Sequence, residues 1–246
     1  MTSIIMLVHN AVEYTRNTIE TLQGTKGEWE LIVVDNASDK KTRKMLYKMY
    51  EMKKINKLLM LDKNTLFAKG NNLGVKLCDS KSEKILLLNS DIDIRNKEWL
   101  SEMEKRYEKG VFTLGVCEND PHVRVDGYCF MIDKDLYTQY LLDENYEWWW
   151  SITKLQAQVL QAGHSVKGVK NCTNLIFHYG GMSGPDYKNA KGMEIELKQV
   201  QEWFGDKEID IIEEIDNMHM DYNPKSRANK MFNKEVRKNS NYKKIG

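Results

Sequence analysis

Residues 84–94, KILLLNSDIDI, decide the fold. The four consecutive apolar residues at 85–88 are few enough for one strand and apolar enough for burial on both faces, which is typical of a central parallel strand. Asp91 and Asp93 follow at the carboxyl edge, where open α/β sheets bind ligands. Carboxylates at i and i+2 of an extended segment lie on one side, so both can face a divalent cation. The alternative is an ordinary polar turn, since Asn, Ser and Asp are common turn residues.

The composition is that of a globular protein, with 30% charged and 41% hydrophobic residues among 246. This length suits one large α/β domain with an appendage. No apolar run is long enough to cross a membrane, and the start, MTSIIMLVHN, lacks the features of a signal peptide, so we expect a cytoplasmic protein. Scattered cysteines without CxxC spacing argue against a zinc site or a disulfide framework. A net charge of +1 gives the whole chain no strong preference for polyanions.

Strand and helix patterns alternate from the first residues to the central strand, which predicts a doubly wound parallel sheet. Before the central strand we expect strands at 3–8, 30–34 and 55–61, helices at 13–23 and 39–52, and a loop leading into a helix at 64–77. After it we expect a helix at 97–109 and strands at 111–116, 126–132 and 165–169.

Asp35 ends the second predicted strand. An acidic residue at this place commonly hydrogen-bonds the ribose or base of a nucleotide. The alternative is a helix N-cap or turn residue. No GxGxxG follows the first strand, which argues against the usual dinucleotide site.

Four motifs in this order resemble family 2 glycosyltransferases of GT-A fold, most closely the rhamnosyl- and galactosyltransferase-like branch: HN at 9–10, VDNAS at 34–38, NTLFAKGNNLG at 64–74 and LLLNSDID at 86–93. The resemblance covers residues 3–185. It implies a Rossmann-like, mostly parallel sheet flanked by helices, a nucleoside diphosphate sugar donor, Mn²⁺ or Mg²⁺, and inversion at the anomeric carbon. One departure is Leu66, where the family usually has Gly.

The resemblance also implies roles for single residues. Val8, Asn10 and Asp35 would line the pocket for the base, and Asp91 beside Ile92 would reach the ribose or a metal-bound water. Asp93 would hold the metal. The residues flanking the nucleotide and diphosphate would be Asn64, Lys69, Asn71 and Asn72. Gly127 and Tyr128 would contribute to the sugar pocket.

His178 ends an apolar run before two glycines, in HYGGMS, and matches the H-x-G-G-x-S loop of the family. There the imidazole would complete the metal shell or touch the diphosphate, and imidazole is a reasonable ligand for Mn²⁺. The alternative is a structural histidine. The physical need for a cation is independent of the resemblance, because negative charge grows on the departing diphosphate and a metal stabilises it.

An inverting transfer also needs a base near the acceptor oxygen. The family's acidic pair would fall on Ser151 and Ile152, so the acid is missing from its expected place. The candidates are Glu147 first, then Glu144 and Asp143. Burial of Glu147 by the neighbouring indoles would raise its pKa toward neutrality. The alternative is a solvated or helix-capping Glu147.

Three adjacent tryptophans at 148–150 cannot all face one core. We expect Trp148 and Trp149 to line the acceptor or sugar pocket, where an aromatic face can stack on a sugar. Core packing is the alternative for each of them.

The resemblance fades near the end, so we predict a GT-A domain at 1–190 and a helical, basic extension at 191–246. An amphipathic helix is expected at 193–204 and a second, acidic one at 209–220. Residues 225–246 hold eight Lys and Arg residues and one Glu. This tail is a solvated end, a contact for an acidic membrane surface, or a nucleic-acid arm.

We therefore expect an inverting, metal-dependent glycosyltransferase acting in the cytoplasm or at the inner membrane face. Its acceptor is a glycan, a lipid-linked glycan, a protein or a modified nucleic acid. One alternative is a sugar-nucleotide-binding protein with weak or no catalysis. Others are a nucleic-acid-binding protein and a nucleotidyltransferase, although the latter normally has a Gly-rich basic loop where this chain has HNAV at 9–12.

Overall fold

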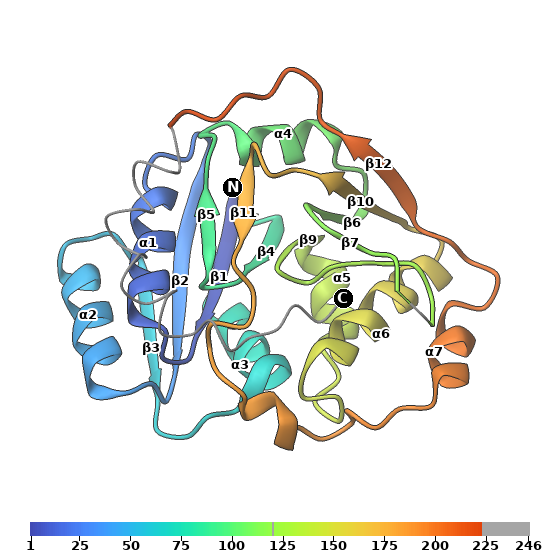
Figure 1. Ribbon diagram of the computed structural model, residues 1–246, viewed down its shortest axis with the longest axis horizontal. Helices are drawn as coiled ribbons and strands as arrows, with labels where there is room; N and C mark the ends of the chain where they lie inside the picture. Colours follow the sequence, from blue (N-terminus) through green and yellow to red (C-terminus); the bar gives the residue numbers. More distant parts are fainter. Residues whose placement is uncertain (120, 223–246) are drawn as a thin grey trace.

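The computed structural model describes residues 1–119 and 121–222. Its centre is an eight-stranded sheet (Figure 1) with the order β12 (Asp210–Glu214), β10 (Ser165–Asn171), β6 (Gly110–Thr113), β9 (Cys129–Asp133), β4 (Lys84–Leu88), β1 (Thr2–Val8), β2 (Trp29–Asn36) and β3 (Lys57–Leu61). Neighbouring strands are parallel except at β9, which runs antiparallel to β4 and β6. This mostly parallel sheet confirms the predicted fold class.

Helices cover both faces of the sheet. One face carries α1 (Val12–Leu22), α2 (Lys40–Glu51) and α4 (Trp99–Arg106), and the other carries α3 (Leu66–Val75), α5 (Lys134–Tyr140), α6 (Trp149–Gln161) and α7 (Leu197–Phe204). Side chains alternate along β1 as a strand requires, with Ile4 and Met6 in the first core and Ile5 in the second. The sheet is therefore buried on both sides, as its continuous apolar strands predict.

A short antiparallel pair lies beside the end of β4. β5 (Ile92–Ile94) pairs with β11 (Ile176–His178), and His178 lies opposite Ile92 in the register. This pairing brings a residue from late in the chain to the carboxyl edge of the sheet. A second pair consists of β7 (Val116–Cys117) and β8 (Arg124–Val125), and β8 contacts α6.

Helix α3 packs closely on the sheet because it carries glycines. A methyl group on Gly74 would lie 2.6 Å from Ile5 Cγ2, and one on Gly70 would lie 2.4 Å from Leu7 Cδ1. The first residue of this helix, Leu66, has a φ of 60°. A glycine adopts that left-handed conformation without a Cβ penalty, which is a physical reason for glycine at this place in the family.

The predicted helix at 209–220 is wrong, because this segment contains β12, which pairs in parallel with β10. Its β-branched isoleucines favour a strand. The helix expected at 193–204 is shorter, as α7, and helix α5 has no counterpart in the sequence prediction. The boundary at residue 190 stays a prediction, and the basic tail at 225–246 lies outside the described residues. Across the described ranges, no helix has the length and apolarity needed to span a bilayer.

Candidate active site

A cavity of about 520 Å³ opens at the carboxyl edge of β1, β2 and β4. Ligands bind at this edge of open α/β sheets. The sheet contributes residues at the strand ends, α6 and the segment before β9 form one wall, and the loop after β11 forms another. The lining includes His9, Asn36, Asn64, Asn89, Asp91, Asp126, Gly127, Tyr128, Trp148, Trp149, Ile152, His178, Met182 and Asp186.

Asp91 and His178 form a polar group at the end of β4. Asp91 Oδ1 lies 3.2 Å from His178 Nε2, and the side-chain nitrogen of Asn89, Nδ2, lies 3.2 Å from the same ring nitrogen. Tyr128 stacks on the imidazole with ring centroids 4.5 Å apart. Burial alone would lower the pKa of His178, but the carboxylates of Asp91 and Asp126 outweigh it and raise the pKa. The sheet edge thus holds a carboxylate, an imidazole and an amide together.

Asp93, the other residue expected at the metal, lies apart from this group. Its carboxylate accepts hydrogen bonds from Asn17 Nδ2 at 3.2 Å and Tyr222, and it pairs with Arg95 Nε at 3.4 Å. The reason is local geometry: the chain turns at Asp91 and the extended segment begins only at Ile92. The i, i+2 rule for a strand therefore does not apply to the two carboxylates.

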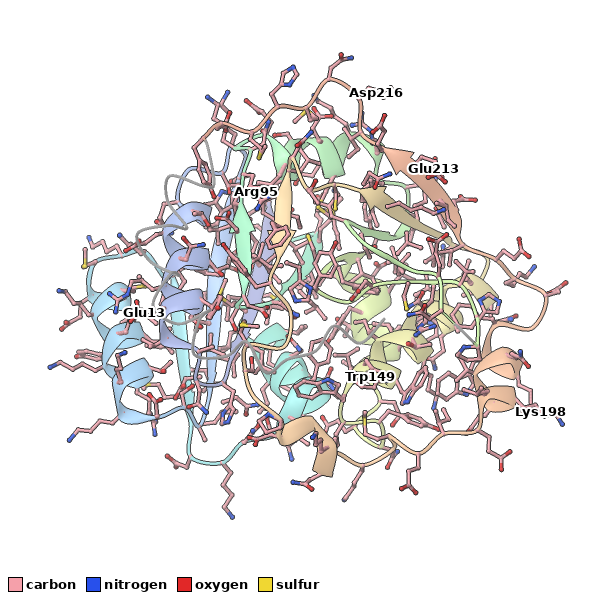
Figure 2. All side chains as sticks on the ribbon, in the orientation of Figure 1. Glu13, Arg95, Trp149, Lys198, Glu213 and Asp216 are labelled. Atoms are coloured by element: carbon pink, nitrogen blue, oxygen red, sulfur yellow. The ribbon has the colours of Figure 1, made fainter. Side chains whose placement is uncertain are left out.

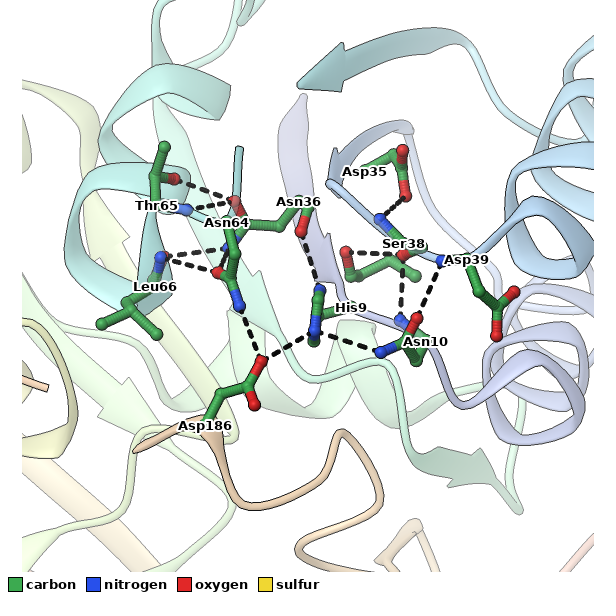
Figure 3. Close-up of polar contacts among 11 residues, drawn as sticks. His9, Asn10, Asp35, Asn36, Ser38, Asp39, Asn64, Thr65, Leu66 and Asp186 are labelled. Atoms are coloured by element: carbon green, nitrogen blue, oxygen red, sulfur yellow. Dashed lines mark hydrogen bonds and ion pairs between the residues drawn. The ribbon is translucent and has the colours of Figure 1, made fainter. Parts of the chain in front are cut away.

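A second polar network lies at the ends of β1 and β2 (Figure 3). Asp186, from the short 3-10 helix Asp186–Asn189, pairs with His9 Nε2 at 2.9 Å and accepts a hydrogen bond from Asn64 Nδ2 at 3.1 Å. Asn36 links the same region, since its side-chain nitrogen donates to Asn64 Oδ1 at 2.7 Å and its oxygen accepts from the Thr65 amide at 2.8 Å. These contacts join the first strand, the loop before α3 and the late loop across the cavity.

The residues predicted for the base pocket lie behind this network. Asp35 has no exposed surface; its carboxylate pairs with Arg43 Nε at 3.2 Å and accepts from the Ser38 amide. Val8 is buried in the core. Asn10 accepts a hydrogen bond from the Asp39 amide at 2.8 Å and contacts His9. The neighbouring Asn36 lines the cavity in the place where the sequence pointed to Asp35.

Helix α3 presents Asn72 away from the cavity. Its side chain donates to the Leu142 carbonyl at 2.9 Å and to Glu144 at 3.2 Å, and it accepts from the Tyr137 hydroxyl. Asn71 is buried and donates back to the Phe67 carbonyl, while Lys69 is exposed and Ile92 is fully buried. Of the four residues expected to flank the diphosphate, only Asn64 lines the cavity.

The three acids predicted as bases are absent from the lining of this cavity and make other contacts. Glu147 accepts a hydrogen bond from the Lys191 amide at 2.7 Å. Glu144 contacts Asn72, and Asp143 pairs with Lys154 at 2.5 Å. Burial works to raise the pKa of Asp143, but the hydrogen bond from Lys154 contributes to holding it below its ordinary value. These acids therefore connect loops rather than face the cavity.

The aromatic and glycine residues predicted for the sugar pocket do line the cavity. Trp148 packs edge-on against Phe67 with centroids 6.3 Å apart. Trp149, labelled in Figure 2, begins α6 and is 43% exposed, whereas Trp150 belongs to the core. Gly127 faces Ile152, since a methyl group there would lie 3.1 Å from Ile152 Cγ2. Trp148 and Trp149 thus line the cavity, and Trp150 does not.

The donor set at Asp91 fits a divalent cation that is shared with a phosphate ligand. Within residues 1–119 and 121–222, no cluster of three or more His, Cys, Asp and Glu side chains is placed to hold a metal ion. A carboxylate oxygen and an imidazole nitrogen 3.2 Å apart supply two ligands of the kinds that Mn²⁺ accepts. Phosphate oxygens commonly supply the others in such sites.

The sequence profile of glycosyl transferase family 2 matches residues 3–162. The chain belongs to this family. A comparison with curated proteins gives no match. The fold is similar to that of TarS 1–349 from S. aureus, with a TM-score of 0.58, 16% identity, and coverage of 82% of this chain and 69% of that one. It is also similar to the mannosyltransferase PcManGT from Pyrobaculum calidifontis in complex with GDP-Man and Mn²⁺, with a TM-score of 0.58, 12% identity, and coverage of 69% and 54%.

These structural likenesses show the fold, which is similar to that of GT-A glycosyltransferases. Against another TarS structure the match, at TM-score 0.51 and 19% identity, covers 65% of this chain and only 33% of that chain. The chain therefore spans about a third of that protein.

Several lining residues were not predicted from the sequence. His9 directly follows the buried strand β1, and Asn36 ends the buried strand β2. Their position at strand ends was the sequence signal that could have identified them as cavity residues. Asp126 precedes the predicted pocket glycine at 127. Asp186 had no local signal, because its contact with Asn64 spans 122 positions in the sequence.

Proposed function

We propose that this protein transfers a hexose from a nucleoside diphosphate sugar to an acceptor hydroxyl with inversion at the anomeric carbon. The observation that carries the proposal is the pairing of Asp91 with His178 at the floor of a cavity in a family 2 glycosyltransferase fold. A donor of this class places two phosphates next to that pair and its sugar toward Trp148 and Tyr128.

We further propose dependence on Mn²⁺ or Mg²⁺. Asp91 and His178 would hold the ion, with Asn89 beside them. A divalent cation bound there neutralises charge that develops on the leaving diphosphate. Asp93 has no part in this proposal, because its carboxylate is bound to Arg95 and Asn17.

The protein's own residues orient the reactants. Asn36, His9 and Asn64 surround the end of the cavity at β1 and β2, where amide and imidazole groups can hydrogen-bond a nucleoside. Trp148 and Trp149 form an apolar wall that restricts water and can stack on a pyranose face. Holding donor and acceptor in line lowers the entropic part of the barrier.

Thermal-shift measurements with UDP-, GDP- and dTDP-sugars, each with and without Mn²⁺, test donor and metal together. A ligand at 100 times its Kd adds about 2.7 kcal/mol of stability, which is about 5–10 °C in Tm for a chain of this size. The Asp91→Asn variant is expected to lose the Mn²⁺-dependent part of the shift. The matched Asp93→Asn variant is expected to keep it, although its own Tm falls.

Stabilisation by none of these donors would refute the proposed donor class. Equal Mn²⁺-dependent shifts in the Asp91→Asn variant and the native protein would refute the assignment of the metal to Asp91. Loss of the shift in Asp93→Asn alone would restore the assignment made from the sequence.

A second candidate function is donor binding without transfer. It is favoured by the contacts of Glu147, Glu144 and Asp143, which turn all three acids toward other loops. Turnover of a bound donor distinguishes the two candidates, since a binding protein releases no nucleoside diphosphate. Location in the cytoplasm and contact of the tail at 225–246 with an acidic membrane remain predictions.

A further inference from the structure

We propose that Asp126 is the general base of the reaction, an assignment that rests on the proposed glycosyl transfer. Asp126 lines the cavity in the segment that leads into β9, opposite the first turn of α6. Nothing in the sequence pattern marked it as catalytic.

The wall formed by α6 carries no acid. Its cavity-lining residues are Trp149, Ile152 and Thr153, preceded by Trp148. A base for the acceptor must therefore come from an element that packs against this wall. The segment that contains Asp126 and Gly127 packs against this wall. Gly127 lies so close to Ile152 that a methyl group on its Cα would lie 3.1 Å from Ile152 Cγ2.

The main chain on the other side of Asp126 is fixed to the same helix. The Val125 amide donates to Gln156 Oε1 at 2.8 Å, and Gln156 Nε2 donates to the Val125 carbonyl at 3.1 Å. Gln156 has no exposed surface. The Asp126 amide donates to the Gly115 carbonyl at 3.0 Å. These bonds hold the backbone of Asp126 in place while leaving its carboxylate to face the cavity.

Among the residues that the structure describes, three acids line the cavity, and two of them have partners there. Asp91 pairs with His178, and Asp186 pairs with His9 and contacts Asn64. Within the described ranges the Asp126 carboxylate makes no hydrogen bond or ion pair. Its negative charge contributes to raising the pKa of His178, so Asp126 lies close enough to interact electrostatically with the Asp91–His178 pair. Asp126 is thus the acid in the cavity that remains available to accept a proton.

The step is balanced as follows. The acceptor hydroxyl oxygen forms a bond to the anomeric carbon while the bond from that carbon to the phosphate oxygen breaks, and its electron pair leaves with the nucleoside diphosphate. The hydroxyl proton passes to the Asp126 carboxylate. No oxidant, reductant or further reactant is required.

The test uses the full chain, the donor that stabilises it most, and water as the acceptor. Release of nucleoside diphosphate is measured with Asp126→Asn and with Asp135→Asn as the matched control, because Asp135 lies on α5 in a surface pair with Lys109. General-base catalysis contributes about 10²–10⁴-fold, so the Asp126→Asn rate is expected to fall by about 100-fold or more. The donor-induced Tm shift and the control rate are expected to stay unchanged.

A second variant separates catalysis from structure. Formate is expected to restore part of the release rate in Asp126→Ala, since a small carboxylate can take the place of the missing side chain. An unchanged rate in Asp126→Asn, or a loss of donor binding equal to the loss of rate, would overturn the assignment. A loss in Glu147→Gln instead would return the role to Glu147. Absence of donor binding in the native protein would refute the proposed function itself, and binding without release would refute a working base.

Discussion

Leu66 offers a test of how the loop before α3 is built. It is the first residue of α3 and has a φ of 60°. A left-handed backbone costs an L-residue about 1–2 kcal/mol. Local bonds hold the conformation: the Leu66 amide donates to Asn64 Oδ1 at 2.9 Å, and its carbonyl accepts from Asn36 Nδ2 at 3.3 Å. The hydrogen bonds that hold this strained backbone therefore come from Asn36 and Asn64, which border the cavity.

The comparison of Leu66→Gly with Leu66→Ala isolates this strain. Both changes remove the same apolar side chain beyond Cβ, so their packing losses nearly cancel. Glycine relieves about 1–2 kcal/mol of strain but loses about 0.4–1 kcal/mol through the greater freedom of its unfolded chain. The Leu66→Gly variant is thus expected to be more stable than the Leu66→Ala variant, by about 1 kcal/mol in the free energy of unfolding. At an ordinary helix position the order is reversed, with glycine about 1 kcal/mol less stable than alanine.

Equilibrium urea unfolding measures the difference, with Lys69 as the control site because it is exposed in the same helix. Lys69→Gly is expected to be less stable than Lys69→Ala. The difference in free energy of unfolding between the Gly and Ala variants is therefore expected to have opposite signs at the two sites, with about 1 kcal/mol at each. If the Leu66→Ala variant is as stable as the Leu66→Gly variant, or more stable, the left-handed conformation of Leu66 is refuted.

Two further predictions concern the sheet. Gly74→Ala places a methyl group 2.6 Å from Ile5 Cγ2, and overpacking of this kind costs about 1–3 kcal/mol, so its urea midpoint should fall; an unchanged midpoint would refute close packing of α3. Burial works to raise the pKa of Glu30, but hydrogen bonds from Lys57 and Ser3 outweigh it and lower the pKa from 4.5. That stabilisation is present above pH 4.5 and is lost as the pH falls through the lower folded pKa. The Tm deficit of Glu30→Gln at pH 7 should therefore shrink at pH 3, and a deficit independent of pH would contradict the role of the charge.

The predictable part of the fold came from runs whose burial is decided locally. Residues 85–88 are apolar without interruption, and they form β4 next to β1 as expected. His178 was expected at this edge because it ends an apolar run before two glycines and matches the family's loop. The pairing of β11 with β5 brings it next to Asp91. In these cases short stretches of sequence already contain the information that fixes the position.

Other positions depend on where the chain turns, and the sequence pattern does not show this. Asp93 was placed beside Asp91 by the spacing rule for strands, but the turn at Asp91 sends its carboxylate to Arg95 and Asn17. Contacts with distant segments also fix Glu147. Its backbone carbonyl accepts a hydrogen bond from the Phe67 amide, and its carboxylate accepts one from the Lys191 amide. A side chain so close to the cavity in sequence is directed elsewhere by contacts with distant segments.

The loop after β11 explains why local motifs describe only part of the site. Its Met182 amide donates to Asp91 Oδ2 at 3.4 Å, while Asp186 reaches His9 at the far end of the cavity. One segment thus contacts both the proposed metal ligand and the proposed nucleoside pocket. Gly180, Gly181 and Gly184 in this loop all have positive φ, which glycine adopts without strain. Asp186 thus places a carboxylate in the cavity proposed for an anionic donor, and its partners there are His9 and Asn64.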